Sequence, residues 1–90
     1  MKTLKFTGQF KKDLKRYQNK PRQINELYSV LALLAEKGKV PQRLKPHYLK
    51  EEYGGCMECH VGNDFLLVWF DEDNDIIKLI RVGSHSELFK

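Results

Sequence analysis

The stretch Phe65-Leu-Leu-Val-Trp-Phe70 is a continuous apolar run in an otherwise polar chain. An unbroken run of this length predicts a central strand whose faces are both covered or partly covered. The Gly62-Asn63 turn precedes it, and the acidic stretch from Asp71 to Asp75 follows it as a solvated turn. Beyond these turns, Cys56 to Val61 and Ile76 to Val82 also have the character of strands. We therefore predict three consecutive strands in the second half of the chain.

The first half of the chain has helical periodicity instead. A short strand at residues 4–6 leads to a helix that Thr7 can cap. A second helix begins at Pro21, where a missing N–H costs least, and ends at Gly38. We predict a short irregular strand over residues 44–50. The apolar stripe of the first helix consists of Phe10, Leu14 and Tyr17.

The resulting order, β-α-α-β-β-β, is typical of an α+β domain in which an antiparallel sheet packs against two N-terminal helices. A short C-terminal helix completes the prediction. The 90 residues, of which 41% are hydrophobic, fit one domain that spans residues 1–90.

Charge is divided unevenly along the chain. Residues 1–50 carry 13 Lys/Arg and 3 Asp/Glu, a net charge of +10, whereas residues 51–90 carry 3 and 9, a net charge of −6. The basic half would attract a nucleic acid or an acidic protein, although a solvated helix surface explains the same pattern. The sequence contains no apolar stretch of the roughly 18 residues that a membrane span needs, and no signal-peptide core at its start. We expect no membrane association and a cytoplasmic location.

Cys56 and Cys59 form a C-x-x-C pair, which is also found in redox and zinc proteins. Positions three apart on a strand point to opposite faces, so the two sulfurs would diverge. A structural zinc site also needs four ligands. We therefore predict two buried or half-buried thiols and no metal, with a zinc-binding or RNA-binding module as the alternative.

The segment from Ser84 to Glu87 matches the capping box S-x-x-E. Ser84 would be the cap and His85 the first helical residue, next to free backbone N–H groups at the positive end of a short helix. Such a position receives phosphate readily. A surface histidine in a helix start is the simpler interpretation.

On the predicted strand from Cys56 to Val61, alternation separates two sets of side chains. Met57, Cys59 and Val61 form the natural core face, and Glu58 and His60 share the outward face, where the carboxylate could orient the imidazole. Asp64 follows just past the turn and could reach the same patch. A partly exposed strand histidine with no chemical role would give the same pattern.

Two further residues depend on a face or a loop that the pattern leaves open. If Ile76, Ile80 and Val82 face the helices, Arg81 points to the side of Glu58 and His60, at the cost of Lys78 on the core face. His47 lies in a basic segment of uncertain structure, and a plain loop residue would fit there equally well.

Four collinear stretches together resemble a known family. They are Phe6-Thr-Gly-Gln-Phe-Lys-Lys-Asp-Leu-Lys15, Lys45-Pro-His-Tyr-Leu49, Glu58-Cys-His-Val-Gly-Asn-Asp64 and Arg81-Val-Gly-Ser-His-Ser-Glu-Leu-Phe89. Each motif is weak alone, but their order along nearly the whole chain is similar to the RelE superfamily of bacterial type II toxin–antitoxin toxins, and within it to the YafQ-like branch.

This resemblance implies a metal-independent endoribonuclease, an mRNA interferase that cleaves mRNA in the ribosomal A site and inhibits translation. It implies no cofactor. Its partners would be mRNA, the ribosome and a cognate antitoxin of the DinJ/RelB type with an acidic segment. Carried over by position, His47, His60, Asp64 and His85 match catalytic residues, Arg81 matches a basic position that we count with them, and Glu58 and Phe89 match an acidic and an aromatic position. We predict that Glu58 and Phe89, together with Lys45 and Lys50, bind the substrate.

Metal-free RNA cleavage needs a base for the 2′-OH, an acid for the 5′-oxygen and a cation for the phosphorane. Our hypothesis gives the acid to His85, the base to His60 with Asp64, and the cation to Arg81, while His47 positions the phosphate. The roles of His60 and His85 are interchangeable at this stage. Phe89 would stack on or orient a base. The alternatives are a ParE-like toxin that binds gyrase and a non-catalytic RNA-binding module.

Overall fold

The computed structural model describes residues 1–89. Its elements follow the predicted order with two added 3₁₀ turns. They are β1 (Thr3–Phe6), α1 (Gly8–Lys15), α2 (Pro21–Lys37), η1 (Gln42–Leu44), β2 (His47–Tyr48), η2 (Glu51–Tyr53), β3 (Met57–Gly62), β4 (Phe65–Asp71), β5 (Ile76–Gly83) and α3 (His85–Leu88). The α+β class and the short C-terminal helix are therefore confirmed. None of the helices within the described residues is long and apolar enough to cross a membrane.

The five strands form one sheet in the order β1-β5-β4-β3-β2. All neighbouring pairs are antiparallel except β1 and β5, which run parallel. The prediction of an antiparallel sheet thus holds for four strands and misses the fifth. Hydrophobic patterns determine which residues are buried, but they carry no information on the direction in which two distant segments pair.

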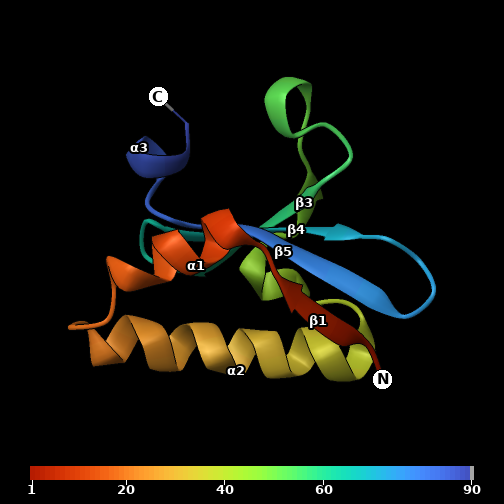
Figure 1. The fold of residues 1–90 in the computed structure, drawn as a ribbon, viewed down its shortest axis with the longest axis horizontal. Coiled ribbons are helices and arrows are strands. Elements are labelled where there is room, and N and C mark those ends of the chain that lie inside the picture. Colours follow the sequence, from red (N-terminus) through yellow and green to blue (C-terminus); the bar gives the residue numbers. More distant parts are fainter. Residues whose placement is uncertain (90) are drawn as a thin grey trace.

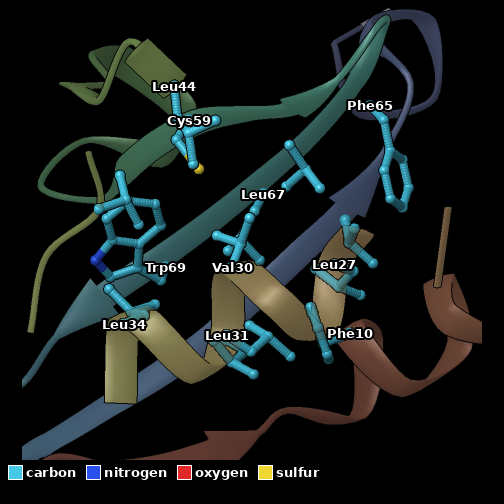
Figure 2. Close-up of a cluster of buried hydrophobic side chains, with 14 of the residues drawn as sticks. Phe10, Leu27, Val30, Leu31, Leu34, Leu44, Cys59, Phe65, Leu67 and Trp69 are labelled. Carbon is cyan, nitrogen blue, oxygen red and sulfur yellow. The ribbon is translucent and has the colours of Figure 1, made fainter. Parts of the chain in front are cut away.

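The apolar stretch that begins at Phe65 is the central strand, β4, as predicted. Its residues from Phe65 to Trp69 are buried, whereas Phe70 is partly exposed. Phe65, Leu67 and Trp69 face α2 and belong to the main core (Figure 2). The alternate residues belong to a second, smaller cluster on the other face of the sheet. Both faces of β4 are therefore covered.

The main core lies between the sheet and α2, which crosses below the strands in Figure 1. Leu27, Val30, Leu31 and Leu34 project from α2 toward the sheet (Figure 2). Pro21 is the first residue of this helix, and Gly38 ends it in the left-handed conformation, with its N–H bonded to the Leu34 carbonyl at 2.8 Å. Both helix boundaries match the prediction.

Helix α1 lies against the edge of β5 beyond the short β1. Thr7 caps it as predicted, because its Oγ1 accepts a hydrogen bond from the Phe10 N–H at 3.2 Å. The same hydroxyl donates to the Leu79 carbonyl at 2.7 Å, so the cap also ties the helix to β5. This position brings the buried side of α1 next to the C-terminal half of β5.

The side chains of β5 do not alternate strictly between the two faces of the sheet. Ile77, Leu79 and Val82 are buried in the main core, whereas Ile80 packs on the second cluster. The condition that Ile76, Ile80 and Val82 all face the helices is therefore met at Val82 and not at Ile80. An irregularity in pairing explains the difference, because Val68 pairs with Arg81 and Trp69 pairs with Leu79, which leaves Ile80 without a direct partner.

Candidate active site

The face of the sheet opposite α2 carries the second cluster. Helix α3 and the connection between β2 and β3 lie on this side, with α2 on the other (Figure 1). Because short segments cover this face, polar side chains beside the cluster can reach solvent. Its buried members are Cys56, Leu66, Val68 and Leu88, with Leu49, Tyr53, Ile80 and Phe89 packed at its border. We refer to this side of the sheet as the open face.

Strand register places His47, Glu58 and Arg81 in one row across the open face. His47 pairs with Glu58, Glu58 with Val68, and Val68 with Arg81. Residues directly opposite one another on neighbouring strands project from the same face of a sheet. Val68 belongs to the second cluster, so the whole row lies on the open face. The ambiguity about Arg81 is thereby resolved in favour of the side of Glu58.

Glu58 contacts His47. The sequence had led us to expect a contact with His60. Glu58 Oε1 lies 3.1 Å from His47 Nε2, and His47 Nδ1 lies 2.9 Å from the Lys45 carbonyl oxygen, so the ring is oriented from both sides. The ring centroids of His47 and His60 are 6.5 Å apart. Glu58 is only 5% exposed. Its Oε2 is buried with no hydrogen-bond partner among residues 1–89.

Asp64 contacts His85 instead of joining His60. It lies in the β3–β4 turn with a positive φ of 50°, and its Oδ1 accepts a hydrogen bond from the His85 backbone N–H at 2.9 Å. The capping box at Ser84 and Glu87 is present as predicted. The expectation of free N–H groups at this helix start is wrong for the His85 amide, because the Asp64 carboxylate occupies it. Asp64 thus holds the residue that carries the exposed imidazole.

Two aromatic side chains flank His85. The Phe89 ring lies 5.2 Å from the His85 ring, and it meets the Tyr53 ring edge to face at 5.6 Å. Phe89 and Tyr53 both border the second cluster. Phe89 is therefore placed beside a candidate catalytic histidine, as the hypothesis requires, and Tyr53 joins it from the connection between β2 and β3.

Arg81 is held by a carboxylate from α1. Its Nε lies 2.7 Å from Asp13 Oδ2 and its Nη2 lies 3.2 Å from Asp13 Oδ1, while its Nη1 donates to the Tyr53 hydroxyl at 2.8 Å. The hydrogen bonds to Asp13 raise the pKa of Arg81, burial opposes them, and the Tyr53 contact adds to the rise. Arg81 is therefore a fixed cation at the border of the open face.

Helix α3 is anchored to the rest of the domain through Glu87. Its Oε1 accepts hydrogen bonds from the Tyr17 hydroxyl at 2.6 Å and from the Ser84 N–H at 2.8 Å. Burial raises the pKa of Glu87, but the hydrogen bonds from Tyr17 and Ser84 outweigh burial and leave it below its ordinary value. These contacts connect the end of α1 to the helix that carries His85.

A cleft of about 490 Å³ opens next to Arg81. The three histidines lie outside it on exposed surface, so the site combines an open histidine surface with an adjacent hollow. The predicted substrate-binding residues Lys45 and Lys50 are exposed on either side of β2, and their role stays a prediction. The cleft is lined by Arg16, Glu51, Glu52, Tyr53, Arg81, Glu87, Leu88 and Phe89.

The sequence analysis missed Asp13, Tyr17, Tyr53 and Glu87 as parts of this arrangement. For Asp13 a signal existed, because it falls three residues after Phe10 and therefore on the apolar stripe of α1. A carboxylate on a buried stripe needs a partner. The partner, Arg81, is 68 positions away in sequence, and only the fold brings the two together.

The two cysteines lie on opposite sides of the sheet, as predicted. Cys59 belongs to the main core and Cys56 to the second cluster, and both are free thiols. Burial, with a smaller contribution from the nearby Glu58 charge, raises the pKa of Cys59 to about 12. Within residues 1–89, no group of three His, Cys, Asp or Glu side chains could hold a metal ion.

A family model described as "Bacterial toxin of type II toxin-antitoxin system, YafQ" matches residues 2–90. The chain belongs to this YafQ family, which confirms the branch that the four motifs indicated.

Individual relatives cover almost the whole chain. The mRNA interferase toxin YafQ of Escherichia coli (strain B / BL21-DE3) is 30% identical over 87 residues, which are 96% of this chain and 94% of the relative. A chain of the E. coli DinJ-YafQ complex is 28% identical with a TM-score of 0.86, at full coverage of both chains. A metal-bound toxin from Helicobacter pylori is 36% identical with a TM-score of 0.85, covering 99% of this chain and all of the other.

Proposed function

We propose that this chain is the toxin of a toxin–antitoxin pair and an endoribonuclease that cleaves mRNA in the ribosomal A site. One observation carries the proposal: the open face holds His47 and His60 near one another, with His85 and the fixed Arg81 at its border. The name of the E. coli relative, an mRNA interferase, supports the same activity. Such a toxin would act in the cytoplasm, where mRNA is translated.

The residues of the open face provide the groups that 2′-OH attack needs. His60 would take the proton of the 2′-OH, and His85 would donate a proton to the departing 5′-oxygen. Arg81 would stabilise the charge of the phosphorane, and His47, oriented by Glu58, would position the phosphate. Phe89, Lys45 and Lys50 would contact the flanking nucleotides.

The contact between Asp64 and the His85 amide changes one part of the earlier hypothesis. Asp64 would act through His85, by fixing the first residue of α3, and no longer through His60. This arrangement fixes the backbone of His85 and leaves its imidazole free to meet the substrate. His60 would work without a carboxylate partner from the β3–β4 turn.

The experiment that tests the proposal is primer extension on mRNA in a reconstituted translation system. We compare the wild type with His85→Ala and with Ser86→Ala, a neighbouring exposed residue, with and without ribosomes. Cleavage at defined codons that needs both ribosomes and His85, and that persists in Ser86→Ala, supports the proposal. No cleavage by the wild type would overturn it and direct attention to gyrase binding.

The reaction as proposed uses no metal, although a metal-bound toxin is among the structural neighbours. Chelation tests this part separately. After treatment of the purified toxin with EDTA and removal of the chelator, the rate of cleavage should be unchanged in a translation system that retains its own Mg²⁺. A loss of activity that Zn²⁺ or Cu²⁺ restores would show that the toxin itself needs a metal.

We also propose that a cognate antitoxin binds the basic half of the chain. The E. coli relative was crystallised with DinJ, and residues 1–50 of this chain have a net charge of +10. An acidic antitoxin segment that folds over this surface would be attracted by charge. Co-expression with a candidate antitoxin that has an acidic segment, followed by copurification in low and high salt, tests the partnership; failure to copurify at low salt would count against it.

A further inference from the structure

Asp13 is a fully buried carboxylate that the proposed reaction does not use. It accepts hydrogen bonds from Arg81, from the Val82 backbone N–H at 3.1 Å and from Gln9 Nε2 at 3.2 Å, and Arg16 Nη1 lies 3.8 Å away. A buried charge is tolerated when it is paired and hydrogen-bonded in this way. The contact to Arg81 is bidentate, which fixes the plane of the guanidinium group as well as its position.

The hydrogen bonds of Arg81 can be counted. A guanidinium group has five N–H donors. Asp13 receives one from Nε and one from Nη2, and the Tyr53 hydroxyl receives one from Nη1. One N–H therefore remains on each terminal nitrogen, Nη1 and Nη2. Arg81 is 16% exposed at its side chain, and it lines the cleft beside Phe89.

We infer that Asp13 is a positioning residue, which with Tyr53 holds Arg81 so that its two remaining N–H groups face the scissile phosphate. This inference rests on the proposed ribonuclease function and specifies which part of Arg81 meets the substrate. Asp13 itself touches no substrate, because it is fully buried on the side of α1 that faces β5. Its effect on the reaction passes through Arg81.

The charges of Asp13 and Arg81 predict that loss of Asp13 affects kcat and not KM. The Asp13 carboxylate offsets the charge of Arg81, so it does not strengthen the general attraction of the site for RNA. Its contribution is orientation, which matters most in the transition state. Asp13→Asn would leave Arg81 charged but poorly oriented. We expect kcat to fall by roughly 10- to 100-fold, the scale of a misplaced catalytic group, while KM for the ribosome-bound mRNA does not rise.

A purely structural role for Asp13 would have different consequences. Asp13 also accepts a hydrogen bond from the Val82 backbone and so supports the edge of β5. If that were its whole role, Asp13→Asn would lower stability, but each folded molecule would retain its turnover. In that case Asp13→Asn would lower the free energy of unfolding by the same amount whether residue 81 is arginine or alanine. With Arg81 absent, the positioning role predicts no further loss of kcat when Asp13 is changed.

The test measures single-turnover cleavage of ribosome-bound mRNA, normalised to the folded fraction, for Asp13→Asn, Arg81→Ala and the double variant. Glu36→Gln, which removes an exposed negative charge on α2, controls for the change in net charge. Tyr53→Phe removes the second hydrogen bond to Arg81 and keeps the ring that meets Phe89, so it replaces Asp13→Asn if that variant fails to fold. We expect a several-fold fall in kcat for Tyr53→Phe.

The Arg81 Nε–H signal in the NMR spectrum of the free protein gives a readout independent of catalysis. In the wild type this proton should exchange slowly with solvent. In Asp13→Asn its signal should disappear or shift toward the chemical shift of an arginine whose Nε–H has no protein partner. A kcat within twofold of wild type in both Asp13→Asn and Tyr53→Phe would overturn the inference, as would an unchanged Arg81 signal. Absence of cleavage by the wild type would instead refute the proposed function, and the NMR signal would still decide whether Asp13 holds Arg81.

Discussion

Removing the hydroxyl of Tyr17 should loosen the attachment of α3 with little change in packing. Tyr17 is buried against Phe65, with ring centroids 4.7 Å apart, and its hydroxyl donates to Glu87 Oε1 at 2.6 Å. Burial and this hydrogen bond raise the pKa of Tyr17, so the hydroxyl stays a donor at ordinary pH. Tyr17→Phe keeps the ring and deletes this donor alone.

The size of the effect follows from the kind of hydrogen bond. A hydrogen bond to a charged group contributes about 1.5–3 kcal/mol to stability. The Glu87 side chain is 32% exposed and keeps its hydrogen bond from the Ser84 N–H, so we discount this contribution for solvent screening to about 1–1.5 kcal/mol. For a domain of this size the midpoint of thermal unfolding should fall by about 5–10 °C.

The effect should also depend on pH. The pKa of Glu87 is lower in the folded protein than its ordinary value of 4.5, so its charged form stabilises the fold above that pH. This stabilisation is lost as the pH falls through the folded pKa. The difference between the wild type and Tyr17→Phe should therefore be complete at pH 7 and shrink as the pH falls from 4.5 through the lower folded pKa.

Urea unfolding at pH 7, repeated at pH 3.5, measures both quantities. Tyr48→Phe is the matched control, because Tyr48 is 72% exposed and should change the free energy of unfolding by less than about 0.5 kcal/mol. A double-mutant cycle with Glu87→Gln should give a coupling energy smaller than the effect of Tyr17→Phe alone, because the glutamine oxygen still accepts the hydroxyl and only the charge is removed. If Tyr17→Phe matched Tyr48→Phe at pH 7, the reasoning that Glu87 anchors α3 through Tyr17 would be refuted.

Three further predictions concern the core, the helix start and the thiols. Leu67→Ala should lower the free energy of unfolding by about 2–5 kcal/mol in a urea titration, since Leu67 is fully buried in the main core; a loss under 1 kcal/mol would contradict that packing. Asp64→Ala should speed hydrogen exchange at the His85 amide and cost about 0.5–2 kcal/mol, and unchanged exchange would mean that the carboxylate does not hold α3. Cys59, with a pKa raised to about 12, and Cys56, whose pKa burial also raises, should resist alkylation by iodoacetamide at pH 8 until urea unfolds the chain; rapid labelling of Cys59 in the folded protein would disprove its burial.

Several local features of the fold could be predicted from the sequence alone. The apolar run at Phe65, the helix stop at Gly38 and the caps at Thr7 and Ser84 all lie where the sequence places them. Each depends on residues within about four positions of one another, such as a side-chain oxygen and a nearby backbone N–H. Local chemistry determines these features before any tertiary contact forms.

The sequence named candidate site residues but did not predict the contacts that they make. The sequence identified Glu58, Asp64 and the three histidines, and it assigned both carboxylates to His60. In the structure, Glu58 contacts His47 across a strand pair and Asp64 contacts the His85 amide. Alternation along one strand shows which side chains share a face, but a cross-strand neighbour is often closer than the next residue on the same face.

The sequence by itself thus determined the elements, their order, the buried faces of β3 and β4 and the residue types available for chemistry. The tertiary structure alone decided that β1 runs parallel to β5, that an irregular pairing turns Arg81 onto the open face, and that Asp13 holds it from 68 positions away. The physical reason is range. Caps and periodicity act within a few residues, whereas strand direction, register and buried ion pairs depend on which distant segments meet when the core closes.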